Sequence, residues 1–157
     1  MVANKTLWAL LIVLAVIWFG PIDYRKLAKP DEARYAEISR EMVASADRLP
    51  PPLTDLKYSE KPPLQYWATA AAFEVFGVSE GPARLWTALT GFAGILLTYF
   101  AGRILFGREQ GFFAAAVLAS SMWYALLGHV NTLDMGLTFF LTLSIFCLLL
   151  AQREHST

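Results

Sequence analysis

The sequence is poor in several features that often reveal the class of a protein. Its only cysteine is Cys147, so the chain forms no internal disulfide. Its 13 basic and 13 acidic residues cancel, and no basic face is present to neutralise the phosphates of a nucleic acid. Charged residues make up only 17% of the chain, whereas hydrophobic residues make up 56%. This composition argues against a soluble domain and against a nucleic-acid partner.

Four windows without charge organise the chain instead. A helix that crosses a bilayer needs about 20 mainly apolar residues, and these windows approach that length. We therefore predict an all-α integral membrane protein with four transmembrane helices. A cleaved signal peptide is the competing interpretation of the first window, although its apolar stretch is long and no small-residue cleavage site follows it. The predicted spans cover about residues 6–22, 84–103, 110–129 and 134–152.

Basic residues predict which side each connection faces. Lys5 precedes the first span, Arg103 and Arg108 lie between the second and third spans, and Arg153 follows the fourth. The positive-inside rule then places both termini and the 103–108 turn in the cytoplasm, and the loop of residues 23–83 outside. Arg25, Lys26 and Lys29 disagree locally, but long loops cross a membrane with less regard to charge.

The outer loop is predicted to carry two interfacial amphipathic helices, over about residues 31–47 and 63–77. Apolar residues recur every three or four positions in the first, which predicts a helix lying along the membrane surface. The prolines between Pro50 and Pro63 interrupt regular structure. Tyr66 and Trp67, in the second helix, are of the type found at the headgroup level. The stripe of the first helix is Tyr35, Ile38, Met42, Ala46 and Leu49.

Four ionisable residues of this chain are candidates for chemistry. Asp31 and Asp134 each begin a predicted helix, on the same side of the membrane, and a carboxylate there can serve as a general base. Glu60 could bind a metal, and the neighbouring Lys61 could stabilise a phosphate leaving group. Each has a structural explanation too: the aspartates as helix caps, the Glu-Lys couple as a solvated pair. His129 is more typical of a structural helix-end histidine than of a metal ligand.

Three ordered motifs carry a family resemblance. The segment from Pro30 to Met42, "PDEARYAEISREM", is followed by Glu60-Lys61-Pro62 with Tyr66-Trp67, and then by Leu133-Asp134. The chain resembles the N-terminal part of the GT-C class of lipid-carrier-dependent glycosyltransferases. Its motifs are most similar to those of the lipid A aminoarabinose transferases, which are related to the protein O-mannosyltransferases. The resemblance covers the chain from the first span onward.

The resemblance implies roles for individual residues. Asp31 corresponds to the catalytic carboxylate that activates the acceptor, and Asp134 to a second acidic residue near the catalytic cavity. Glu60 corresponds to the ligand of a divalent metal ion, and Lys61 to a contact of the carrier phosphate. Arg34 and Tyr35 lie in the same motif and are expected to support substrate binding.

The function implied is transfer of a sugar from a polyprenyl-phosphate donor, such as undecaprenyl phosphate, to a lipid or protein acceptor. It would occur on the periplasmic face of a multi-pass protein of the bacterial inner membrane, as in lipopolysaccharide modification. Family members have about a dozen spans, so we expect this chain to be a part of such an enzyme and stand-alone activity to be absent. The alternative is a catalytically inactive, truncated membrane protein that only binds lipid or partner helices. A small channel is a weaker alternative, because charged residues are absent from the spans.

Overall fold

The computed structural model describes residues 4–45 and 63–155, and these residues form helices and no strand. The prediction of an all-helical chain is confirmed. In chain order the helices are α1 (Asn4–Phe19), α2 (Asp31–Ser45), α3 (Leu64–Phe76), α4 (Glu80–Leu105), α5 (Arg108–Ser120), α6 (Met122–Leu127) and α7 (Asp134–His155).

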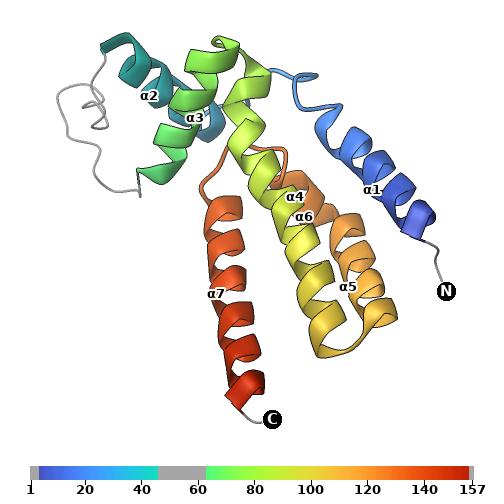
Figure 1. Cartoon of the computed structure of the whole chain (residues 1–157). Coiled ribbons are helices and arrows are strands. Elements are labelled where there is room, and N and C mark those ends of the chain that lie inside the picture. The colour runs from blue at the N-terminus through green and yellow to red at the C-terminus, as the bar shows by residue number, and fades with distance from the viewer. Residues whose placement is uncertain (1–3, 46–62, 156–157) are drawn as a thin grey trace.

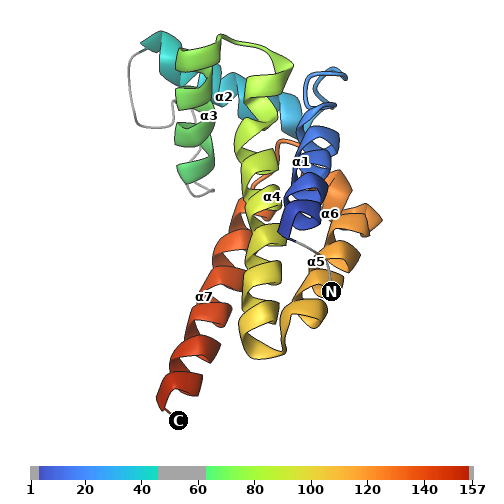
Figure 2. The ribbon, with the colours of Figure 1, turned by 45° about the vertical axis from the view of Figure 1, so that its right-hand side comes forward.

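The longest helix, α4, organises the others. α5 folds back along its C-terminal half, α7 runs along another side, and α1 lies against its upper part (Figures 1 and 2). α2 and α3 pack together at the end of the bundle where α4 begins, opposite the α4–α5 turn. The guanidinium of Arg153, near the end of α7, donates a hydrogen bond to the carbonyl oxygen of Ile104, next to that turn. The α4–α5 turn and the end of α7 therefore lie at the same end of the bundle.

Among the described residues, two helices are long and apolar enough to cross a membrane, as judged by length and composition alone. They are α4 and residues Asp134–Arg153 of α7. The apolar part of α1, Trp8–Phe19, is shorter than these two helices.

The segment expected to form one helix over 110–129 is divided. α5 ends at Ser120, Ser121 has an extended backbone with φ −66° and ψ 119°, and α6 begins at Met122. The prediction of one continuous helix was therefore wrong. Serine hydroxyls compete for backbone hydrogen bonds and make the Ser120-Ser121 pair a weak point in a helix. The hydroxyl of Ser120 donates to the carbonyl oxygen of Val117 in this way.

The apolar stripe of α2 packs against protein. Tyr35, Ile38 and Met42 are buried and form one cluster with Tyr66 and Ala70 of α3. The rings of Tyr35 and Tyr66 lie 6.0 Å apart. Tyr66 is therefore part of this core and not a headgroup anchor, whereas Trp67 is exposed. Helical spacing gives the same stripe whether the covering surface is lipid or a neighbouring helix. Ala46 and Leu49, the remaining residues of the stripe, lie outside the described residues.

A distant side chain caps the start of α4. Ser79 occupies the N-cap position but its hydroxyl makes no capping hydrogen bond. The backbone N–H of Gly81 instead donates to Oδ1 of Asp23, at 2.7 Å. This bond satisfies one of the orphan donors at the helix start and ties the loop after α1 to α4.

Two glycines let α4 and α5 approach closely. A Cβ atom on Gly111 would lie 2.6 Å from the carbonyl oxygen of Tyr99, and one on Gly102 would lie 2.8 Å from the Cα of Gly111. No side chain fits at either position without a backbone shift. Small residues at such a crossing are typical of helix pairs that pack by close backbone contact.

Trp18 anchors the end of α1. Its indole N–H donates to the carbonyl oxygen of Ala88 in α4, at 2.9 Å, and only 3% of the residue is exposed. The indole ring fills the space that a side chain at Gly91 or Gly128 would need, so glycine at both positions makes room for it. The upper end of α1 is thus fixed to both α4 and the end of α6.

Candidate functional site

A buried ion pair lies at the end of the bundle where α2 and α4 begin. Oε1 of Glu32, in the first turn of α2, accepts a hydrogen bond from Nε of Arg84 at 2.6 Å, and Oε2 accepts one from Nη2 at 3.3 Å. Each side chain is 1% exposed. Such a fork-to-carboxylate geometry is the strongest form of side-chain ion pair. It joins two helices whose paired residues lie 52 positions apart.

Backbone carbonyls take up the other donors of Arg84. Nη1 donates to the carbonyl oxygens of Ile22 and Arg25, at 3.0 and 2.7 Å, and Nη2 donates to that of Lys26 at 3.1 Å. The loop between α1 and α2 therefore wraps around one guanidinium. A buried arginine is tolerated only when its N–H groups are satisfied in this manner.

The Glu32 carboxylate reaches further, to a third part of the chain. Oε1 accepts a hydrogen bond from the backbone N–H of Asn131 at 3.0 Å, and Oε2 accepts one from the N–H of Ala28 at 2.7 Å. A second cation, Arg25, donates to Oε2 at 3.0 Å. One carboxylate thus holds together the loop before α2, the start of α4 and the connection between α6 and α7.

These contacts set the charge state of Glu32. Burial raises the pKa of its carboxyl by desolvation, but the hydrogen bonds from Arg84, Ala28 and Asn131 and the charge of Arg84 outweigh that effect. The net pKa lies below the usual value of 4.5. Glu32 is therefore ionised at neutral pH although its side chain is buried.

Asp31, the predicted catalytic carboxylate, is the residue before Glu32 and, unlike Glu32, is exposed. Its side chain is 57% exposed and its Oδ1 accepts a charge-assisted hydrogen bond from Nη2 of Arg34. The guanidinium of Arg34 also lies 5.4 Å from the ring centre of Tyr35. Asp31, Arg34 and Tyr35, three of the predicted site residues, are thus neighbours in the first two turns of α2.

Asp134 opens α7 and is exposed. The two residues that lead to it are held against α2. Leu133 packs on the cluster of Tyr35 and Ile38, and the N–H of Asn131 binds Glu32. The structure therefore brings the starts of α2 and α7 together at one end of the bundle, as the shared side of the two aspartates requires.

The starts of α2 and α7, where Asp31 and Asp134 are exposed, are called the carboxylate rim below. A buried amide pair lies beneath it. Nε2 of Gln65, in α3, donates to Oδ1 of Asn131 at 2.6 Å and lies 3.3 Å from the hydroxyl of Thr87 in α4. Gln65, Thr87 and Asn131 are all buried. The pair ties α3 and α4 to the same connection between α6 and α7 that Glu32 binds. Buried polar side chains therefore support the carboxylate rim.

Glu60 and Lys61, the predicted metal ligand and phosphate contact, lie outside the described residues. Within residues 4–45 and 63–155, no cluster of three or more His, Cys, Asp or Glu side chains is suited to a metal ion. Both ring nitrogens of His129 already have partners in the fold, so neither is open to a metal ion. Nδ1 and Nε2 lie 2.6 Å from the carbonyl oxygens of Ala125 and Trp18, respectively. Its role in the fold is structural.

Sequence reasoning missed the residues that organise this site. Glu32 lies inside the motif from Pro30 to Met42 and Arg84 begins the predicted span 84–103, but neither was singled out as a site residue. A usable signal was present for Arg84, since an arginine beside an apolar window needs a partner. No local signal distinguishes Glu32 from Glu37, which forms an exposed pair with Arg40. Asn131 and Gln65 carry no signal of their own.

The family model described as dolichyl-phosphate-mannose-protein mannosyltransferase matches residues 3–157. Among curated relatives, the undecaprenyl phosphate-alpha-4-amino-4-deoxy-L-arabinose arabinosyl transferase of Aeromonas salmonicida is 33% identical over 95% of this chain and 27% of its own length. Arabinosyl transferase 1 of Proteus mirabilis is 37% identical over 92% of this chain and 27% of its own length.

Two solved structures of one protein also match the chain. The crystal structure of ArnT from Cupriavidus metallidurans bound to undecaprenyl phosphate has a TM-score of 0.83 and 41% identity, covering 89% of this chain and 26% of that one. The apo structure of the same protein has a TM-score of 0.80 and 43% identity, with the same coverage. The chain thus spans about a quarter of the length of the proteins it matches.

Proposed function

The chain belongs to the dolichyl-phosphate-mannose-protein mannosyltransferase family, and we propose that it forms the N-terminal catalytic part of a lipid-carrier-dependent glycosyltransferase. The donor is a sugar linked to undecaprenyl phosphate, and 4-amino-4-deoxy-L-arabinose is the sugar that its relatives' names favour. The acceptor is a lipid, with lipid A as the first candidate.

The observation that carries this proposal is the link made by Glu32. Its carboxylate binds the backbone of Asn131, so the turn that leads to Asp134 is tied to the helix start that bears Asp31. Two exposed carboxylates at one rim, on buried and rigid supports, suit a site where an acceptor is deprotonated beside an anionic leaving group. The chemistry needs that support, because exposed loops alone do not hold reacting groups in place.

We assign the roles as follows. Asp31 takes the proton from the acceptor oxygen, which then attacks the anomeric carbon of the sugar. The bond between that carbon and the phosphate oxygen breaks, and undecaprenyl phosphate departs with the bonding electrons. Asp134 orients the acceptor, while Arg34 and Lys61 offset the phosphate charge and Tyr35 borders the sugar.

Glu60 is proposed to hold a divalent metal ion near the departing phosphate, where such an ion would supply charge neutralisation. Glu60→Gln is expected to lower the metal content of the purified protein, measured by elemental analysis. Glu37→Gln, on an exposed carboxylate of α2, is the matched control. Unchanged metal content in Glu60→Gln would remove Glu60 from this role.

We further propose that α1, α4, the α5–α6 pair and α7 cross the bacterial inner membrane. The α4–α5 turn then faces the cytoplasm, and α2 and α3 lie on the periplasmic side. Arg103 and Arg108 at that turn, and Arg153 at the same end, support this orientation. Cysteines placed at positions 31 and 107 should react with a membrane-impermeant thiol reagent from opposite sides. Labelling of both from the same side would contradict the orientation.

The function is tested by Asp31→Asn in the protein expressed from the complete reading frame. Transfer of labelled aminoarabinose from undecaprenyl phosphate to lipid A is the measurement, and we expect its loss with membrane insertion unchanged. Glu37→Gln, on the same helix, should retain transfer. Full transfer by Asp31→Asn would rule out Asp31 as the base. Turnover by the isolated 157-residue chain would contradict the view that it is only one part of the catalytic unit.

A further inference from the structure

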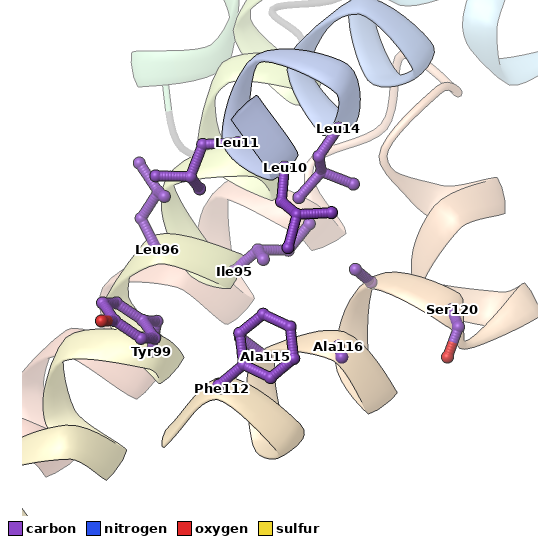
Figure 3. Close-up of a pocket in the computed structure, with 11 residues that line it drawn as sticks. Leu10, Leu11, Leu14, Ile95, Leu96, Tyr99, Phe112, Ala115, Ala116 and Ser120 are labelled. Carbon is purple, nitrogen blue, oxygen red and sulfur yellow. The ribbon is translucent and has the colours of Figure 1, made fainter. Parts of the chain in front are cut away.

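Two cavities meet between α1 and the helices that it faces. The larger, of about 340 Å³, lies between α1, α4 and α5 and is lined by side chains such as Leu10, Ile95 and Phe112 (Figure 3). The second, of about 290 Å³, lies nearer the loop after α1. Leu14 and Ala119 line both cavities, which therefore adjoin along α1, and we refer to the two together as the groove.

The groove changes in chemistry along its length. Of the residues that line the larger cavity, only Tyr99 and Ser120 carry a side-chain polar group. The second cavity begins with Leu14 and Ile17 and ends at Tyr24, Arg25 and Arg84. An apolar trough that ends at cations matches an amphipathic molecule with a hydrocarbon chain and an anionic head.

The charged end of the groove has an excess of positive charge. Glu32 neutralises one of the two arginines that bind it, Arg25 and Arg84. Arg84 is buried and its donors are occupied. Arg25 also donates to the carbonyl oxygen of His129, but its side chain is 41% exposed. Asp23 adds a carboxylate to the same loop, where it caps α4. Lys26 and Lys29 follow in the same loop and are exposed.

We propose that this groove binds an anionic phospholipid of the surrounding bilayer, with its phosphate at Arg25 and one acyl chain along Leu14 and Ala119. Basic pockets between membrane helices take anionic headgroups, and the apolar part of the groove offers an acyl chain an apolar surface. The lining of the groove differs from the proposed reaction site, because neither Asp31 nor Asp134 lines either cavity. The proposal needs the chain to lie in a bilayer but does not depend on sugar transfer.

The test uses the purified chain in nanodiscs made of equal parts phosphatidylcholine and phosphatidylglycerol. Native mass spectrometry then reports which lipid stays bound. We expect phosphatidylglycerol to be retained about fivefold over phosphatidylcholine, because one basic residue near an anionic headgroup contributes about 1 kcal/mol. Arg25→Gln should abolish that preference, while Arg40→Gln, on an exposed cation outside the groove, should keep it.

A second variant keeps the test decisive if Arg25→Gln fails to fold. Ala119→Phe fills the junction of the two cavities without touching the ion pair and should lose the bound lipid. Ala114→Phe, on an exposed position of the same helix, should retain it. Equal retention of both lipids by the native chain would overturn the proposal, as would full retention by Ala119→Phe. Displacement of phosphatidylglycerol by undecaprenyl phosphate at equal concentration, or a lipid-free dimer disrupted by Ala119→Phe, would also overturn it.

Discussion

The two ends of α4 are held in different ways. At its start, Arg84 and Glu32 form a buried polar centre with directional bonds to three other parts of the chain. At its other end, Gly102 and Gly111 let α4 and α5 touch by backbone alone. The first end is sensitive to the loss of one charge, and the second to the gain of one methyl group. The end that bears the proposed reactive groups is the one built from directional contacts.

The sharpest test of this comparison is Arg84→Met. It leaves Glu32 buried without its main partner, and breaking a buried pair on one side costs about 3–5 kcal/mol. Unfolding in mixed micelles, followed by circular dichroism, measures the loss. Arg40→Met breaks the exposed Glu37 pair, which water and salt screen, and should change stability far less than Arg84→Met does.

The double variant Glu32→Met with Arg84→Met separates charge from packing. Since no buried ion then lacks a partner, it should be more stable than Arg84→Met alone. It should not regain everything, because the carbonyls of Ile22, Arg25 and Lys26 lose their donor. A double variant less stable than the single one would show that the pair is not the source of the effect.

Gly111→Val probes the opposite end. The added side chain would meet the backbone of Tyr99 and Arg103, and we expect a loss of about 1–3 kcal/mol from overpacking. The same unfolding assay applies. Ala114→Val, three positions further along α5 and exposed, should stay within about 0.5 kcal/mol of the native chain. A tolerated Gly111→Val would mean that close backbone contact is not needed there.

The pH dependence of stability should also distinguish the two ends of α4. Because the pKa of Glu32 is lowered in the folded state, its contribution to stability is fully present above about pH 4.5 and is lost as pH falls through the folded pKa. The stability difference between the native chain and Glu32→Gln should therefore be constant near neutrality and shrink in acid. A difference that grows as pH falls would contradict the sign.

The smallest expected effect lies between the two ends, at Trp18. Trp18→Phe removes the hydrogen bond to Ala88 and should cost about 1 kcal/mol in the same unfolding assay. Trp123→Phe, at an exposed indole, is the matched control. Equal effects of the two substitutions would show that the bond to Ala88 adds nothing.

Much of the fold follows from local pattern, and the site does so only in part. The uncharged windows indicated where apolar helices lie, and three-to-four spacing predicted α2. The sequence could not show what covers the apolar face of α2, because the helical spacing of apolar residues is the same whether lipid or α3 covers that face. The break at Ser121 depends on a balance of weak backbone preferences. Motif resemblance predicted roles for Asp31 and Asp134. The partners of Arg84 lie 52 to 62 positions away, and no local rule pairs residues at that distance.

The arrangement around Arg84 has a consequence for biosynthesis. Every acceptor of its guanidinium, namely Glu32 and the carbonyls of Ile22, Arg25 and Lys26, is made by the ribosome before Arg84 itself. The guanidinium can therefore be bound as it emerges, before the apolar remainder of α4 is made. The contact between Glu32 and Asn131 forms later, after the other partners of Glu32 have been made.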